Sequence, residues 1–313
     1  MGATDCLSGL DNAWAETIDN HVADVITNSW TDGTDDITLL GTDYVEFYEQ
    51  FSTEAALTGI TVNFSSGDSG DHTAGGTDKA AKTVEFPADL PYVTGVGGSS
   101  VFIGSHRQWL GEYGWQTDYS KLTNGAWTPA PPGTYNSGGG GGTSQLFNQP
   151  WYQVGKVPAS ISQYYSSTPM RAVPDIAMDG DPNTGIIVGE TQVFPDGTYW
   201  DQYRIGGTSL SSPLLAGVVA VANQVHHHPL GFINPLYYRL LGTSALHDTV
   251  APASPLAQVR TDYTNALDNS QGKFWRLQTV DVQSSTLHDT PGYDDETGVG
   301  TPRGPAFFFG ARH

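Results

Sequence analysis

Apolar residues recur with two different periods along the first hundred positions of the chain. Helical spacing of apolar side chains predicts helices at Leu10–His21 and Tyr44–Leu57. Short apolar runs predict buried strands at Ala23–Ser29, Ile60–Ser66 and Tyr92–Gly97. Because helices alternate with apolar strands, this half of the chain predicts an α/β fold with a mostly parallel sheet covered by helices on both faces.

The strongest helical pattern of the whole chain lies in its second half. Thr208–Val225 is almost wholly apolar after Pro213, so we expect this helix to be central and buried. Phe232–Leu241 is a further candidate helix, and Ile186–Glu190 and Gln192–Phe194 are candidate short strands.

Regular patterns are weak in two other regions. Ser99–Gln149 is rich in Gly, Pro, Trp and Tyr, which predicts long surface loops with irregular short strands, and the chain after Asp262 is polar with few periodic segments. Gly138–Gly142 is a run of five glycines. Such a run forms a flexible linker, or a loop that lets another backbone approach closely, and the sequence leaves both interpretations open.

The charge balance is strongly acidic, with 33 Asp and Glu against 13 Lys and Arg and a net charge of −20. Nucleic acids and anionic membranes are poor partners for such a surface. The composition fits either simple solubility at neutral pH or adaptation to acid. Near pH 4 the carboxylates begin to neutralise, and a chain poor in Lys and Arg then avoids strong positive self-repulsion.

Three further features of the sequence concern disulfides, membrane insertion and export. Cys6 is the only cysteine, so no disulfide forms within the chain and the redox compartment stays open. No stretch of about 18 apolar residues predicts a membrane helix. Met1–Asn12 lacks the basic start and apolar run of a signal peptide.

A serine with the surroundings of a nucleophile lies at the start of the apolar helix, in the segment Gly206-Gly207-Thr208-Ser209-Leu210-Ser211-Ser212-Pro213. The first turn of a helix leaves backbone N–H groups unpaired, and the helix dipole favours negative charge there. Pro213 lacks an amide proton and leaves a carbonyl near Ser209 without its helical partner. An ordinary N-cap is the alternative, but the paired glycines and the buried helix favour a nucleophile.

A second candidate is the acidic residue in Ser65-Ser66-Gly67-Asp68-Ser69-Gly70, directly after a predicted strand. Open α/β sheets bind ligands at the carboxyl ends of their strands. Taken alone, Asp68 is better explained as a residue that caps a turn.

These two motifs together resemble the sedolisin–kumamolisin family of serine-carboxyl peptidases. The family places its nucleophilic serine in a Gly-Thr-Ser-x-x-x-Pro segment, which implies that Ser209 is the nucleophile, and its Gly-Asp-Ser-Gly segment implies that Asp68 is the oxyanion-hole residue. A carboxylic acid must be protonated to donate to an oxyanion, which requires low pH or a raised pKa. Further matching segments occur in the family order: Ala23–Trp30, Phe86–Gly98, Gly138–Phe147 and Arg171–Gly185.

Related subtilisins use a histidine base instead, and the upstream histidines His21, His72 and His106 lack the His-Gly-x-His context. The sedolisin base is a glutamate supported by an aspartate four residues later. That pair precedes the region matched by Met1–Cys6, so we expect it to lie outside this sequence. The resemblance therefore implies a subtilisin-like catalytic domain over residues 1–313 whose first elements are missing.

The family also binds one calcium ion near its C-terminus, which implies a calcium-binding region at about residues 260–304 here. Calcium prefers carboxylate and carbonyl oxygens. The match assigns the side chains of Asp262 and Asp294 and the carbonyls of Tyr263, Thr290 and Gly292. An acidic loop in solvent is the alternative.

The resemblance implies a secreted, monomeric endopeptidase of acidic pH optimum that hydrolyses peptides or proteins and is made with an N-terminal propeptide. Two alternatives stay open: a fragment or pseudoenzyme that only binds peptides, and a calcium-stabilised binding protein.

Overall fold

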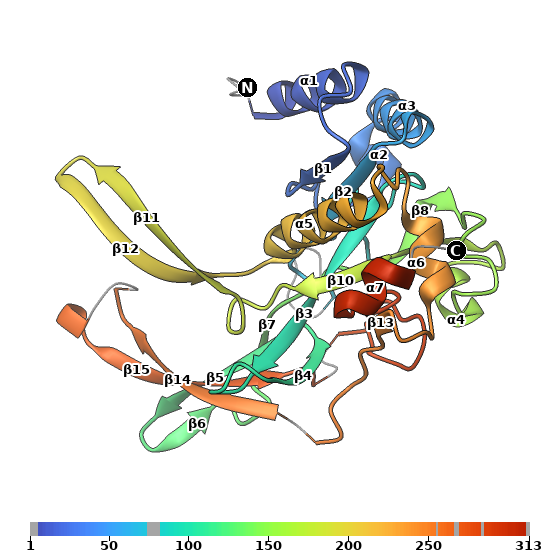
Figure 1. Cartoon of the computed structure of the whole chain (residues 1–313). Helices are drawn as coiled ribbons and strands as arrows, with labels where there is room; N and C mark the ends of the chain where they lie inside the picture. Colours follow the sequence, from blue (N-terminus) through green and yellow to red (C-terminus); the bar gives the residue numbers. More distant parts are fainter. Residues whose placement is uncertain (1–5, 74–81, 255, 266–268, 283–284, 311–313) are drawn as a thin grey trace.

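A five-stranded sheet, four of whose strands run parallel, forms the centre of the computed structural model (Figure 1). Its order is β1 (Val25–Asn28), β2 (Thr61–Ser65), β3 (Thr94–Ile103) and β10 (Ile176–Asp179), and β4 (Trp109–Gly114) pairs antiparallel with β3. The strands β1, β2, β3 and β10 run parallel to their neighbours. The structure describes residues 6–73, 82–254, 256–265, 269–282 and 285–310.

Helices cover both faces of this sheet. On one face α5 (Thr208–His226) lies against the parallel strands, with α6 (Asn234–Leu240) and α7 (Gly304–Gly310) beside it. On the other face α1 (Cys6–Asp19) and α3 (Thr42–Thr58) pack on β2 through a second apolar core. Two shorter helices are α2 (Ile37–Leu40) and α4 (Ala159–Ser162).

An antiparallel sheet extends from the core on one side (Figure 1). Its strands, in spatial order, are β14 (Leu256–Tyr263), β15 (Lys273–Val280), β5 (Gln116–Thr123) and β6 (Ala126–Thr128), and β7 (Thr134–Gly138) also pairs with β5. We call the β14–β15 hairpin the lower arm.

A second hairpin, the upper arm, is formed by β11 (Ile186–Phe194) and β12 (Gly197–Ile205) and projects on the same side as the lower arm (Figure 1). Most of its residues are exposed. The remaining short elements are β8 (Gly142–Asn148) with β9 (Met170–Val173), β13 (Leu246–His247) with β16 (Thr301–Pro302), and the 3-10 turn η1 (Asn269–Gln271).

Most elements expected from apolar periodicity are confirmed: the two helices and three strands of the first half, and both helices of the second half. Residues 99–149 contain the expected short strands, β4 to β8, but β5 and β8 are partly buried, so the expectation of mainly surface loops is wrong. The two short strands expected at 186–194 are one continuous strand, and β12, β14 and β15 were not foreseen. Among the described residues, no helix combines the length and hydropathy needed to span a bilayer.

A buried ion pair connects β9 to the sheet. The guanidinium of Arg171 donates to both carboxylate oxygens of Asp175 at 2.9 and 2.7 Å, and both side chains are inaccessible to solvent. Asp175 also accepts hydrogen bonds from the Gly95 amide and the Tyr238 hydroxyl. All these partners belong to the core, so Asp175 has a structural role.

Candidate active site

Asp68 lies directly beside the start of α5. Its carboxylate oxygen Oδ1 accepts hydrogen bonds from the backbone N–H of Thr208 at 2.7 Å and from the Thr208 hydroxyl at 2.9 Å. The Thr208 hydroxyl also accepts from the Gly67 amide at 3.1 Å. The turn after β2 and the first turn of α5 are therefore joined, and Asp68 and Ser209 come together although 140 residues separate Asp68 from Thr208.

The second carboxylate oxygen of Asp68 faces the backbone of Gly207. A Cβ at Gly207 would lie 2.7 Å from Oδ2 of Asp68, and its φ of +88° lies in a region that L side chains rarely adopt. Only glycine fits here, because any side chain would overlap the carboxyl group. Since both Thr208 donors use Oδ1, Oδ2 is the oxygen that can carry a proton and donate it.

Ser209 is exposed at the first turn of α5. Its backbone carbonyl lacks the usual helical donor because that position is Pro213. The hydroxyl of Ser29, which follows β1, donates to this carbonyl at 3.2 Å. The hydroxyls of Thr27 and Ser212 lie 2.8 Å apart one helical turn further on, so the end of β1 fixes the position of the turn that carries Ser209.

The glycine run holds the Asp68 turn from the other side. The amides of Gly138 and Gly140 donate to the carbonyls of Asp68 and Gly67 at 3.0 and 2.8 Å. A Cβ at Gly140 would overlap the Ser66 carbonyl. The run is therefore a site of close backbone approach, and the alternative of a flexible linker is wrong.

The Asp68 turn also rests on a buried pair of titratable side chains, His72 and Glu85. Nε2 of His72 lies 2.9 Å from Oε1 of Glu85, and the Glu85 carboxyl occupies the space where a side chain at Gly67 would be. Although Asp68 itself is reached by solvent, desolvation by the surrounding protein is the largest effect on its pKa and raises it. The Glu85 charge adds to this rise, while the Thr208 hydrogen bonds oppose it.

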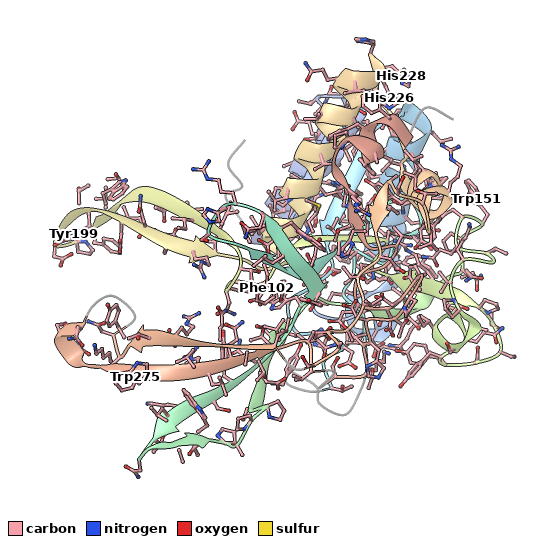
Figure 2. The ribbon with its side chains drawn as sticks, turned by 60° about the horizontal axis from the view of Figure 1, so that its bottom comes forward. Phe102, Trp151, Tyr199, His226, His228 and Trp275 are labelled. Atoms are coloured by element: carbon pink, nitrogen blue, oxygen red, sulfur yellow. The ribbon has the colours of Figure 1, made fainter. Side chains whose placement is uncertain are left out.

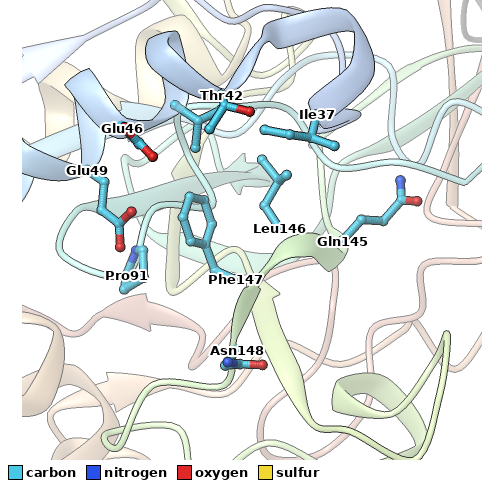
Figure 3. Close-up of a pocket in the computed structure, with 10 residues that line it drawn as sticks. Ile37, Thr42, Glu46, Glu49, Pro91, Gln145, Leu146, Phe147 and Asn148 are labelled. Atoms are coloured by element: carbon cyan, nitrogen blue, oxygen red, sulfur yellow. The ribbon is translucent and has the colours of Figure 1, made fainter.

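A groove of about 620 Å³ lies behind the glycine segment, between the start of α3 and β8 (Figure 3). Glu46 and Glu49 of α3 line it together with Leu146 and Phe147 of β8. Neither Asp68 nor Ser209 is among its lining residues, so this groove is separate from the candidate chemistry.

The predicted metal ligands divide into two groups. Asp262 lies on the lower arm, where its carboxylate is bound by the Nε atoms of Arg260 and Arg276 at 2.6 and 2.8 Å. Tyr263 is next to it and exposed. Asp294 is instead buried in the turn that holds the other two predicted ligands, Thr290 and Gly292. Among the contacts of the described residues, none brings Asp262 to Asp294.

Asp248 takes the place beside this turn that the sequence prediction gave to Asp262. Both of its carboxylate oxygens lie 3.1 Å from the Gly292 amide. Asp294 accepts hydrogen bonds from the amides of Glu296 and Thr297 at 2.9 and 2.6 Å, and the Thr290 amide lies 3.4 Å from it. Burial and the charge of Asp289 raise the pKa of Asp294 well above its usual range.

These observations test whether calcium fits the turn. Two carboxylates, Asp248 and Asp294, flank backbone that can turn carbonyls toward a shared ion, and a cation would relieve the cost of the buried acid. Within the described ranges, no group of three or more His, Cys, Asp or Glu side chains is arranged to hold a metal. A site here would therefore depend on carbonyl oxygens.

Comparison with known proteins decides the family. A model of the subtilase family matches residues 3–273. The chain belongs to the subtilase family. Within this family it is a sedolisin-type catalytic domain: it is 31% identical over 255 residues to kumamolisin from Bacillus sp. (strain MN-32), and 30% identical over 251 residues to sedolisin from Pseudomonas sp. (strain 101).

The two alignments cover 80% and 77% of this subtilase but only 36% and 37% of the relatives, so the chain spans less than half of the length of these curated proteins. A solved structure titled as Pseudomonas sedolisin, a serine-carboxyl proteinase, complexed with two molecules of pseudo-iodotyrostatin has a TM-score of 0.66. The match covers 95% of this chain and 67% of that one at 24% identity, and it confirms the subtilisin-like α/β fold.

The sequence did not reveal every residue that shapes the site of this subtilase. Ser29, Glu85 and His72 act through contacts between distant segments, and no local pattern marks them. Asp248 directly follows β13 (Leu246–His247), and only the pairing of β13 with β16 brings it beside the terminal glycine turns, so no local pattern marks it either.

Proposed function

We propose that the complete protein is a serine-carboxyl endopeptidase that hydrolyses peptide bonds at acidic pH. The observation that carries this proposal is the pair of hydrogen bonds from Thr208 to Asp68, which puts a carboxyl group of raised pKa beside the exposed nucleophile candidate Ser209. Membership of a family of serine-carboxyl peptidases supports the reaction class.

In this proposal the Ser209 hydroxyl attacks the carbonyl carbon of the scissile peptide bond. Negative charge develops on the carbonyl oxygen, and the Ser209 amide and the protonated Asp68 donate hydrogen bonds to it. The Ser209 proton passes to a carboxylate base that returns it to the leaving amine. The resemblance to sedolisins assigns this base to a glutamate with an aspartate four residues later, upstream of the region matched by Met1–Cys6. Glu85 and Asp89 have this spacing, but they follow Asp68 in the chain and do not lie on a helix.

The acidic optimum follows from the state of Asp68. Only its protonated form donates to the oxyanion, and this form is lost as pH rises through the raised pKa. A carboxylate base imposes the opposite limit, because it must be ionised to accept a proton and is neutralised below about pH 4. The two requirements together define an activity range on the acid side of neutrality.

We also propose that one calcium ion stabilises the turn between β15 and β16. Asp294 keeps the role predicted for it, and Asp248 replaces Asp262 as the second carboxylate ligand. The ion would supply positive charge to a buried acidic turn, with Thr290 and Gly292 offering carbonyls. By resemblance, we further propose that the protein is secreted as a monomer that carries an N-terminal propeptide before maturation.

A chemical probe tests the nucleophile without requiring turnover. A fluorophosphonate should phosphonylate Ser209 of the complete protein between about pH 3 and 6 with loss of fluoride, and mass spectrometry of the digested adduct identifies the residue. Ser209→Ala should abolish labelling, whereas Ser211→Ala provides a matched control on the same helix. Labelling that survives in Ser209→Ala would contradict the proposal, and binding of a peptide without labelling would favour the peptide-binding alternative.

Peptidase assays of the 1–313 polypeptide test the assignment of the base. Without a positioned base, general acid–base catalysis of about 10²–10⁴-fold is lost, so we expect little or no cleavage of denatured protein from pH 3 to 7. Strong cleavage that Ser209→Ala abolishes would mean that a carboxylate within residues 1–313 serves as the base.

A further inference from the structure

A groove of about 550 Å³ lies between the two arms. One wall is formed by Ile187, Gln202 and Arg204 of the upper arm, the other by Gln258 and Arg260 of the lower arm, and Pro182 and Asn183 form the floor. We propose that this groove binds an extended, acidic segment of a polypeptide substrate. This inference rests on the proposed peptidase function and adds a substrate class to it.

The groove is continuous with the segment that carries Ser209. Its upper wall, β12, ends at Ile205 and leads directly into Gly206 and Gly207. The Gly207 amide donates to the Gly180 carbonyl at 2.6 Å, and a Cβ at Gly206 would overlap the backbone of Pro182. A polypeptide held at Ser209 therefore meets the groove floor within a few residues.

The groove lining is basic although the chain is acidic. Two of the 13 basic residues, Arg204 and Arg260, line the groove, and Asp262 pairs with Arg260 beside it. The groove lining includes two arginines and no carboxylate. A segment rich in Asp and Glu complements this charge pattern.

The two arginines are held in place but keep free donor capacity. Arg260 donates to the Asn183 side chain and to Asp262, and Arg204 donates to the Asn183 carbonyl. A guanidinium has five N–H donors, so both retain donors for a carboxylate. Asp262, the expected calcium ligand, thus serves to position Arg260 and Arg276.

The arms also provide backbone and aromatic contacts suited to an extended chain. β14 is the last strand of its sheet, so among the described strands its outer edge has no partner and an extended peptide can add to it. Tyr199 and Trp275 are about half exposed on the two arms (Figure 2). Arginine and aromatic residues are enriched in protein-binding surfaces.

Binding of labelled peptides to the full-length protein carrying Ser209→Ala tests this proposal. We would compare a fluorescent peptide of about ten residues containing several Glu with the same peptide carrying Gln, by anisotropy at pH 6. The acidic peptide should bind about tenfold more tightly, and 0.5 M salt should remove most of this preference. Equal binding of the two peptides would overturn the proposal.

Arg204→Ala tests whether Arg204 contributes to binding of the acidic peptide. It should weaken binding of the acidic peptide about fivefold and leave the Gln peptide unchanged. Lys156→Ala, which removes an exposed cation elsewhere, is the matched control and should change neither. Equal weakening of the binding of both peptides by Arg204→Ala would indicate structural damage and overturn the assignment. Arg204→Gln should keep the melting temperature of the wild type and still lose the preference for the acidic peptide.

Two further outcomes remain informative. If the protein sediments as a dimer that Arg204→Ala dissociates, the groove is an interface between copies and the proposal is wrong. Labelling of Ser209 is measured separately from peptide binding. If Ser209 is labelled but the protein shows no preference for the acidic peptide, only the proposal for the groove is refuted. If the protein prefers the acidic peptide but Ser209 does not react, only the proposed peptidase function is refuted.

Discussion

Oδ1 of Asp68 accepts both the amide and the hydroxyl hydrogen bonds of Thr208, which leaves Oδ2 as the oxygen that faces the start of α5. In the proposed mechanism the two oxygens have different tasks. Oδ1 holds the carboxyl group in position through Thr208, and Oδ2 would carry the proton that an oxyanion needs. The geometry makes the protonated state of Asp68 testable by substitution.

We expect Asp68→Ala to lower kcat of the complete enzyme by about 10²–10³-fold, the usual cost of losing an oxyanion-hole donor. Asp68→Asn should lose less, because its carbonyl oxygen can accept from Thr208 while its amide donates at every pH. The pH–rate profile should therefore lose part of its decline above the pKa of Asp68. Equal activities for the two variants, with unchanged pH profiles, would contradict the assigned role.

Calcium binding predicts a difference between two aspartates. Excess calcium should raise the melting temperature of the wild-type protein and chelator should lower it, because an ion that binds only the folded state stabilises it. Asp248→Asn should remove this response with little effect on the metal-free protein, since Asp248 is exposed. Asp262→Asn should keep it. A chelator response that depends on Asp262 and not on Asp248 would restore the original assignment.

The sequence predicted the core well because buried helices and strands have apolar residues at regular spacing. The strand β2 is buried along its whole length and the helices α3 and α5 each bury a face, so apolar spacing identified them. The two arms have no such apolar pattern. Along β11 and β12 nearly every residue is at least partly exposed, so neither face carries an apolar alternation.

The sequence predicted those features of the candidate active site that depend on residues close together in the chain. Pro213 implied a carbonyl without its helical donor near Ser209, and the structure identifies that carbonyl as the one of Ser209 itself and its new donor as Ser29. The donor could not be predicted, because it comes from a segment 180 residues earlier in the chain. Asp262 was misplaced for a similar reason: it pairs with Arg260 two residues earlier on the same strand and with Arg276, which only the pairing of β14 with β15 brings beside it.

The buried pair of Arg171 and Asp175 predicts a large effect on stability. Asp175→Ala would leave the Arg171 guanidinium charged and unpaired in the core, and such a change typically costs about 3–5 kcal/mol. Denaturant unfolding should show this as a lower midpoint with little change in slope. The exposed α3 variant Glu46→Ala is the control and should stay within about 0.5 kcal/mol of the wild type. A similarly small effect of Asp175→Ala would mean that the pair is dispensable.

The last prediction concerns the pH dependence of stability, which follows from buried carboxyl groups outside the calcium turn. Asp89 is inaccessible to solvent, and its Oδ2 accepts from the Ser144 hydroxyl at 2.6 Å. Burial, with a smaller contribution from the charge of Asp35, raises the pKa of Asp89 to about 7. Desolvation likewise raises the pKa of Asp179 to about 7.

Between the ordinary pKa of 3.8 and about 7, the folded protein therefore binds more protons at these groups than the unfolded chain does. The stabilisation is fully present below about pH 4 and is lost as pH rises through the folded-state value. We expect the melting temperature, measured at constant calcium, to fall by several degrees from pH 5 to pH 7. Asp89→Asn should make this decline smaller, because the amide keeps the Ser144 contact and does not ionise. Glu46→Gln, at an exposed position, should leave the slope unchanged, and a melting temperature that instead rises toward pH 7 in the wild type would show that these carboxyl groups are ionised in the folded protein.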